Sequence, residues 1–100
     1  MYALIRTYDG GNDFADVLIE REEDIRDVIG SIDGFRGYYL IRAPQGPITI
    51  SVFENQESAE ASSSAAAEYI TDNLLDVSPA SPHVSGGEIA LSFASSLSHS

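Results

Sequence analysis

Residues 33–54 read DGFRGYYLIRAPQGPITISVFE and decide the fold. Two runs rich in aromatic and β-branched residues, 35–43 and 48–54, flank the sequence PQGP at 44–47. Aromatic and β-branched side chains favour strands, whereas proline and glycine favour a turn between them. The stretch therefore predicts a β-hairpin, and the rest of the chain is arranged around it.

The residues before the hairpin predict a strand and a single long helix. Tyr2–Tyr8 is an uninterrupted β-type run that ends at the turn signal Asp-Gly-Gly at 9–11. Asn12 or Asp13 can cap a helix, and Gly34 can end it in the left-handed conformation. The apolar residues between them follow a 3.6-residue period: Phe14, Val17, Leu18, Ile25, Val28, Ile29 and Ile32.

The residues after the hairpin predict a second helix and a fourth strand. Asn55 can cap a helix over about 56–75, whose buried side is mostly small: Ala59, Ser62, Ser63, Ala66, Ile70 and Leu74. A loop over 76–87 contains two prolines and two glycines, and 88–94 is predicted as a strand. Residues 95–100 are predicted to be a flexible tail.

The order β-α-β-β-α-β is that of a ferredoxin-like α+β domain over residues 1–94. Two helices should cover one face of a four-stranded antiparallel sheet. Alternation in the third strand places Ile48, Ile50 and Val52 opposite Thr49, Ser51 and Phe53, so neither face is charged. We therefore expect the second face to be covered as well, by the sheet of another copy.

This pattern resembles the dimeric α+β barrel superfamily, and in particular its antibiotic-biosynthesis monooxygenase-like branch. The resemblance rests on residues 33–42, with Gly-x-x-Gly-Tyr at 34–38, on Ser-Val-Phe-Glu at 51–54, and on Gln-Glu-Ser-Ala-Glu at 56–60. It implies a homodimer with back-to-back sheets, and a small cavity between the sheet and the helices of each protomer.

Relatives in that branch include cofactor-independent oxygenases that act on aromatic polyketides or quinols, haem-degrading enzymes, and members with no assigned activity. The haem-degrading members use an Asn/Trp/His set. This chain has no tryptophan, and its only histidines are His83 and His99, so haem degradation is set aside. The resemblance therefore implies no cofactor, and a small aromatic ligand is the expected partner.

Composition narrows the function classes. Sixteen acids face five arginines and no lysine, for a net charge of −11, which argues against binding nucleic acid or an anionic membrane. The acidic surface is expected either to keep the protein soluble or to be an adaptation to a cytoplasm of high salt concentration. The absence of cysteine excludes disulfides and thiolate sites. The chain shows neither a basic leader nor an apolar run of membrane-spanning length, so we expect a soluble, cytoplasmic protein.

Four tyrosines are the principal pocket candidates: Tyr8, Tyr38, Tyr39 and Tyr69. A tyrosine-lined cavity can pack on a planar substrate and hydrogen-bond its oxygens, although tyrosines also fill sheet faces and interfaces. Tyr38 and Tyr39 must point to opposite faces, so at most one of them faces a cavity between sheet and helices.

Three strand arginines, Arg6, Arg36 and Arg42, are candidates for gripping a carboxylate or phenolate. The plainer interpretation is a salt bridge to one of the many acids. His83, in a proline-flanked loop, is the candidate general base, against the simpler view that it is an exposed loop histidine. Helical spacing scatters the acids of 20–24 around the axis, so no metal site is predicted.

Two functions remain open on the sequence. The first is a cofactor-independent oxygenase-like enzyme for a small aromatic or quinol compound, with a tyrosine-rich pocket. The second is a non-catalytic dimeric module that binds a small molecule or serves as an accessory protein. The enzyme needs a buried titratable group beside an apolar cavity, whereas the module is compatible with a cavity filled by side chains.

Overall fold

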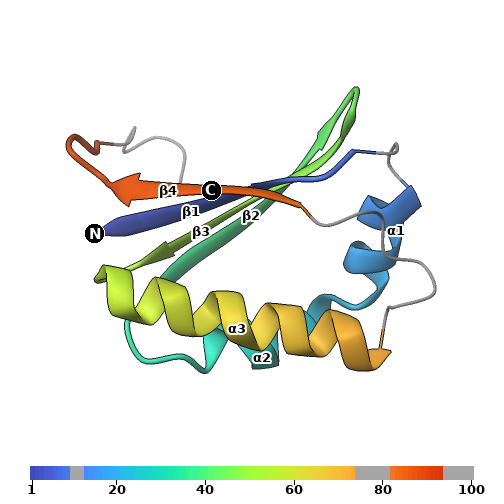
Figure 1. The fold of residues 1–100 in the computed structure, drawn as a ribbon, viewed down its shortest axis with the longest axis horizontal. Helices are drawn as coiled ribbons and strands as arrows, with labels where there is room; N and C mark the ends of the chain where they lie inside the picture. Colours follow the sequence, from blue (N-terminus) through green and yellow to red (C-terminus); the bar gives the residue numbers. More distant parts are fainter. Residues whose placement is uncertain (10–12, 74–81, 94–100) are drawn as a thin grey trace.

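The elements follow the predicted order, except that the first helix is split in two (Figure 1). The computed structural model describes residues 1–9, 13–73 and 82–93. Its elements are β1 (Tyr2–Thr7), α1 (Asp13–Glu20), α2 (Glu22–Gly30), β2 (Phe35–Ala43), β3 (Gly46–Phe53), α3 (Gln56–Asn73) and β4 (His83–Glu88). The tail predicted for 95–100 lies outside the described residues.

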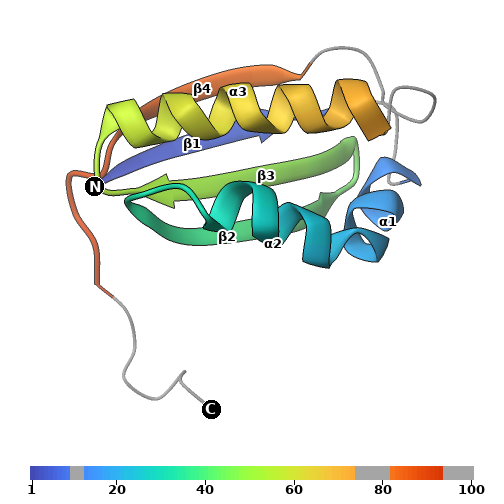
Figure 2. The ribbon, with the colours of Figure 1, turned by 90° about the horizontal axis from the view of Figure 1, so that it is seen from below.

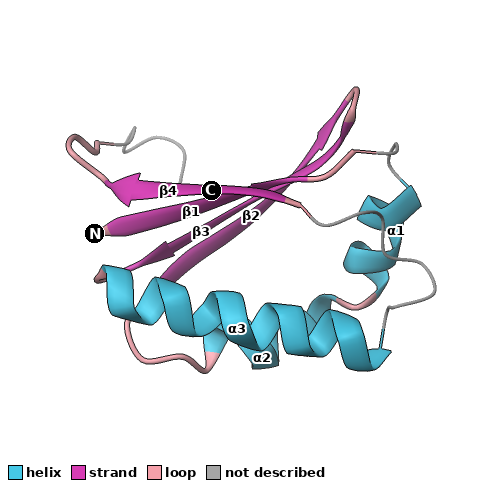
Figure 3. Ribbon diagram, in the orientation of Figure 1, coloured by secondary structure: helices cyan, strands magenta, loops and turns pink. Residues whose placement is uncertain are grey.

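The four strands form one sheet in the order β2-β3-β1-β4, and every neighbouring pair is antiparallel (Figure 3). This is the predicted ferredoxin-like arrangement, so the fold class is confirmed. The central strand β3 places Ser51 opposite Tyr38 of β2 and opposite Leu4 of β1. This register fixes which side chains of the three strands share a face.

Two of the helices, α2 and α3, lie side by side on one face of the sheet (Figure 2). Helix α1 packs near the hairpin end of β3. The buried apolar core lies between the helices and the sheet and consists of Leu4, Tyr8, Phe14, Leu18, Ile25, Ile29, Phe53 and Ala59. The rings of Tyr8 and Phe14 pack with their centroids 5.0 Å apart, which anchors α1 to β1.

The prediction of a single helix between β1 and β2 is wrong, because the helix is interrupted at Arg21. This residue has φ −101° and ψ 24°, outside the helical region. The apolar stripe is itself interrupted here, since Leu18 and Ile25 are separated by charged residues. The break lets α1 pack against β3 while α2 packs against α3 and β2.

The fourth strand also differs from the prediction. It covers His83–Glu88 rather than 88–94, and it pairs with β1 from Thr7 opposite His83 to Tyr2 opposite Glu88. The Ile89 N–H then donates to the carbonyl of Met1 at 2.7 Å, and Met1 is the residue before the start of β1. The more apolar residues after Ile89 have no residue of β1 to pair with. The available pairing partner therefore sets the bounds of β4 more strongly than the β propensity of the sequence does.

The hairpin and the helix caps follow the sequence closely. Strand β2 has the predicted bounds, and β3 begins at Gly46, which leaves a two-residue turn instead of the predicted four. Gly46 has φ +147°, and a Cβ there would lie 2.1 Å from the Tyr8 carbonyl oxygen. The Ser58 N–H donates to Asn55 Oδ1 at 2.8 Å, which confirms the predicted cap of α3. The predicted end of that helix at 75 lies outside the described residues.

The second face of the sheet has no helix on it (Figure 1). Alternation puts an apolar set on this outer face: Ala3, Ile5, Tyr39, Ile41, Ile48, Ile50 and Val52. Ile5, Tyr39 and Ile41 are 38%, 59% and 43% exposed, which is high for large apolar side chains in a sheet. No helix in the described part of the chain is long and apolar enough to cross a membrane.

Candidate functional site

A pocket with a volume of about 490 Å³ lies between the helices α1 and α2 and the strand β2. Leu18 of α1 and Ile25 and Ile29 of α2 form its helical wall. Strand β2 forms the opposite wall, through Phe35, Tyr38 and Leu40. Pockets of this size and mostly apolar lining bind small organic molecules. We call this space the outer pocket.

A second, smaller pocket of about 30 Å³ lies deeper against the sheet. It shares Leu18, Ile25, Ile29 and Tyr38 with the outer pocket, so the two are neighbours. The rest of its lining combines the polar residues Arg6, Tyr8, Thr49 and Tyr69 with the apolar residues Val28, Ala66 and Ile70. The charged residues of the outer pocket, Glu22 and Arg26, pair with each other. We call this space the inner pocket.

Arg6 lies on β1 between Leu4 and Tyr8 in the alternation, so its side chain points toward the helices. It is only 5% exposed. Its Nη2 donates a hydrogen bond of 2.9 Å to Ser63 Oγ on α3, and no carboxylate among the described residues pairs with it. An arginine this buried normally has an acidic partner.

The other four arginines each have such a partner. Arg21 pairs with Asp24 at 3.8 Å, Arg26 with Glu22 at 2.5 Å, Arg42 with Asp16 at 2.5 Å, and Arg36 with Glu54. All four pairs lie on the surface. Arg6 therefore differs from the other four arginines: each of those pairs with a carboxylate on the surface, whereas Arg6 is buried and pairs with no carboxylate of the described residues.

The two tyrosines beside Arg6 are held in the neutral form. Burial raises the pKa of Tyr38 to about 12, and the neighbouring Tyr8 adds to the increase while Arg6 opposes it. Burial likewise raises the pKa of Tyr8, again opposed by Arg6. Both hydroxyls therefore carry their protons near neutral pH and can donate hydrogen bonds to a ligand oxygen.

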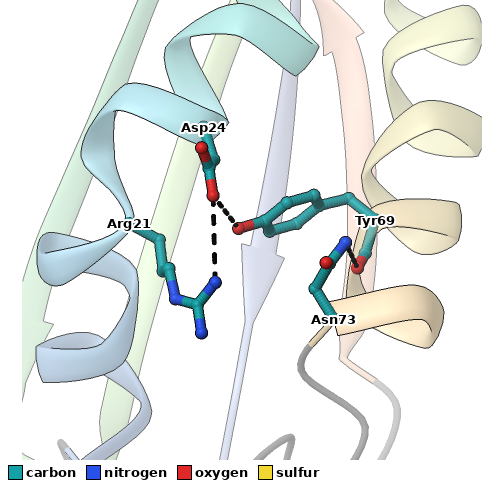
Figure 4. A network of polar contacts seen from close by, with 4 residues as sticks. All are labelled: Arg21, Asp24, Tyr69 and Asn73. Atoms are coloured by element: carbon teal, nitrogen blue, oxygen red, sulfur yellow. Dashed lines mark hydrogen bonds and ion pairs between the residues drawn. The ribbon is translucent and has the colours of Figure 1, made fainter.

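A polar network on the helix side connects α3 to α2 beside the inner pocket (Figure 4). The Tyr69 hydroxyl donates to Asp24 Oδ2 at 2.9 Å, and Arg21 Nη1 lies 3.8 Å from the same oxygen. Asn73 Nδ2 donates to the Tyr69 carbonyl at 3.1 Å. Burial raises the pKa of Tyr69, as do its hydrogen bond to Asp24 and the charge of that carboxylate. The network fixes the Tyr69 ring as part of the inner pocket wall.

The structure brings together only some of the predicted site residues. Tyr8, Tyr38 and Tyr69 line the inner pocket, and Tyr39 lines the outer pocket although alternation places it on the outer face of the sheet. Arg36 and Arg42 line neither pocket, and both make surface salt bridges instead.

His83 lies at the exposed start of β4, opposite Thr7, and lines neither pocket. Its catalytic role stays a prediction, and this placement does not support it.

Sequence reasoning favoured Arg36 and Arg42, which alternation places on one side of the second strand with Tyr38, over Arg6 and therefore missed the importance of Arg6. The signal was its position: Arg6 lies between Leu4 and Tyr8 on the face that the helices cover. Thr49 and the three wall residues Leu18, Ile25 and Ile29 are further members of the site. Their apolar periodicity predicted burial, but it could not distinguish a core residue from a pocket wall.

The pocket does not fit a haem group held through its iron. Haem iron is ligated by histidine, cysteine, methionine or tyrosine, and the described residues that line the two pockets include none of the first three. The tyrosine shared by both pockets, Tyr38, has a pKa of about 12, which disfavours the phenolate that would bind iron. No group of three His, Cys, Asp or Glu within the described ranges could hold a metal ion.

No protein-family model matches the chain, and no curated protein matches it. Solved structures do. The heme-degrader MhuD of Mycobacterium tuberculosis, with two hemes bound, matches with a TM-score of 0.67 at 14% identity, over 94% of this chain and 100% of that one. A mutant of MhuD with manganese protoporphyrin IX bound reaches a TM-score of 0.74 at 13% identity, over 95% and 100%.

An oxygenase has a similar structure. SnoaB of Streptomyces nogalater, a cofactor-independent oxygenase, matches with a TM-score of 0.62 at 9% identity, over 94% of this chain and 95% of that one. These identities are low, so the likeness concerns the fold. At that level it confirms the ferredoxin-like α+β fold predicted from the sequence.

Proposed function

We propose that the chain is a cofactor-independent oxygenase for a small aromatic or quinol compound, which binds in the outer pocket. The observation that carries this proposal is the composition of the two pockets: an apolar cavity of about 490 Å³ borders a polar inner end with a buried guanidinium and neutral tyrosine hydroxyls. A phenol can pack its ring against the apolar walls and direct its oxygen toward Arg6.

The chemistry needs no external reductant. A positive charge beside a phenol oxygen lowers the pKa of that phenol, so Arg6 favours the phenolate. The electron-rich para carbon then bonds to O2, and the resulting hydroperoxide takes up a proton and loses water. The sum is phenol plus O2 giving quinone plus water. In this account Arg6 stabilises the anion, and Tyr38 donates a hydrogen bond to an oxygen of the substrate.

The test is oxygen uptake with 1-naphthol in the presence of a metal chelator. We expect one O2 consumed for each 1,4-naphthoquinone formed. Gly30 provides a graded pair of variants, because it lines the outer pocket and a Cβ there would meet only Arg26 Cγ, at 3.9 Å. Gly30→Ala should keep most of the activity, and Gly30→Leu should lose it by filling the pocket. Equal activity in both variants would place the reaction elsewhere.

A non-catalytic binding module is the second candidate, and one observation favours it. The described residues that line the pockets include no histidine and no buried carboxylate, so the site lacks an ordinary general base. In that case 1-naphthol would bind with the same sensitivity to Gly30→Leu, but no oxygen would be consumed. The same pair of variants therefore separates the two candidates.

The proposed assembly is a homodimer in which two outer sheet faces pack together. The support is the outer face itself, whose large apolar residues Ile5, Tyr39 and Ile41 have no layer over them within one chain. Sedimentation velocity should give a dimer, and Ile41→Glu should give a monomer because it places charge in the interface. A wild-type monomer would contradict the proposal. The cytoplasmic location stays a prediction.

A further inference from the structure

Arg6 is buried, and none of the acidic side chains that the structure describes pairs with it. The sequence has sixteen acids and only five arginines, so acidic partners are abundant. Four of the arginines use them, on the surface. The fifth, which is the most buried, faces a cavity instead. A purely structural arginine would gain most from an internal carboxylate, and residues 1–9, 13–73 and 82–93 supply none to Arg6.

The described polar groups that line the inner pocket with Arg6 are neutral. Tyr8 directly follows β1, Tyr38 comes from β2, Thr49 from β3, and Tyr69 from α3, as does Ser63, which accepts the Arg6 hydrogen bond. The nearest helix acid in this network, Asp24, already accepts the Tyr69 hydrogen bond and pairs with Arg21 (Figure 4). The site around Arg6 therefore holds hydrogen-bonding groups and one uncompensated positive charge.

The guanidinium also has donors to spare. It has five N–H groups, and the structure gives it one side-chain hydrogen bond, to Ser63 Oγ. Across the described ranges, Ser51 Oγ is the only fully buried side-chain nitrogen or oxygen without a partner. The unused nitrogens of Arg6 are therefore not sealed within the protein, and they open onto the inner pocket that Arg6 lines.

The two volumes indicate how large the anionic group is. The inner pocket, at about 30 Å³, is too small for a ring, so it can take only a small polar substituent. The outer pocket, at about 490 Å³, holds one or two fused rings. Tyr38 lines both spaces, so a ring in the outer pocket has its substituent directed toward the inner one.

We propose that the ligand of this site is an aromatic carboxylic acid, whose carboxylate is bound by Arg6 in the inner pocket while its ring occupies the outer pocket. This inference rests on the proposed function only for the location of the pocket. A guanidinium can bind a carboxylate through two parallel hydrogen bonds, which fixes orientation as well as charge. An inorganic anion would satisfy the charge but would leave the apolar walls exposed to water.

The experiment is a calorimetric titration with two ligands of equal shape, 1-naphthoate and the neutral 1-naphthamide, and with phosphate as the inorganic anion. The proteins are the wild type, Arg6→Gln, Arg6→Lys and the control Arg42→Gln, whose arginine lies in a surface salt bridge. Neither naphthyl ligand needs to react, so binding is measured apart from turnover.

We expect the wild type and Arg42→Gln to bind the acid at least tenfold more tightly than the amide, as a charge-assisted contact requires. Arg6→Gln should remove that preference, and Arg6→Lys should keep part of it. Equal affinity for acid and amide in the wild type would overturn the proposal, as would a preference that survives in Arg6→Gln. Tight phosphate binding that does not compete with 1-naphthoate would also contradict it.

The outcome is separable from the oxygenase proposal. A clear acid preference without oxygen uptake from 1-naphthol would uphold this inference and refute the oxygenase. Oxygen uptake from 1-naphthol without a preference for the acid over the amide would support the oxygenase and refute this inference. If Arg6→Gln fails to fold, the acid–amide comparison in the wild type and Arg6→Lys still decides.

Discussion

Replacing Arg6 with methionine should make the ligand-free protein more stable. The substitution removes a buried charge, keeps a long flexible side chain, and deletes one hydrogen bond, the one to Ser63 Oγ at 2.9 Å. A residue kept for ligand binding is commonly retained at the expense of stability. The direction of the change therefore distinguishes a binding arginine from a structural one.

The magnitude follows from two opposing terms. Burying a guanidinium without a counter-charge costs several kcal/mol even after relaxation. The hydrogen bond from Arg6 to Ser63 offsets about 1.5–3 kcal/mol of this burial cost. The difference predicts a gain of about 1–2 kcal/mol for Arg6→Met, which corresponds to about 5–15 °C in melting temperature for a domain of this size. Ser63 is half-buried and can bind water in the variant.

The assay is thermal and urea unfolding of the ligand-free protein, followed by circular dichroism. The matched control is Arg42→Met, which breaks an exposed salt bridge to Asp16 and should lose no more than about 1 kcal/mol. If Arg6→Met instead loses about 2 kcal/mol or more, Arg6 holds the fold together, and the reasoning that assigns it to a ligand is refuted.

Three further predictions concern the rest of the domain. Because the pKa of Tyr38 is about 12 when folded and near 10 when unfolded, stability should fall as the pH rises from about 10 to 12, by up to about 1.4 kcal/mol per pH unit, and less so in Tyr38→Phe. The melting temperature should rise with added salt, since screening reduces the self-repulsion of a chain with net charge −11; a flat response would contradict this. Asn55→Ala should cost about 1 kcal/mol in urea unfolding by removing the cap of α3, and Asn55→Asp should restore most of it.

The fold could be predicted because its signals are local. The hairpin of β2 and β3, the cap at Asn55 and the turn at Gly34 each depend on residues near one another in the sequence. The break at Arg21 and the bounds of β4 depend on distant partners. The helix breaks so that each half can pack on a different element, and β4 ends opposite Tyr2, where β1 begins.

The site was harder to predict, because it too depends on residues that are distant in the sequence. Alternation showed that at most one of Tyr38 and Tyr39 faces a cavity between sheet and helices, but not which one. It could not show that Arg36 and Arg42 have surface acids within reach, whereas Arg6 pairs with no acid of the described residues. Which arginine lacks a partner is a property of the assembled layers, since the acids concerned come from α1 and from the end of β3.

The most direct measurement follows the arginine side chains by NMR during a titration with 1-naphthoate. The five arginines and the absence of lysine make the Nε–Hε spectrum simple enough to assign by single substitutions. We expect the Arg6 Nε–Hε signal to shift with the backbone amides of Ile29 and Tyr38, while Arg21, Arg36 and Arg42, which line neither pocket, stay unchanged. Shifts confined to the surface arginines, or none at Arg6, would contradict a ligand site between the helices and the sheet.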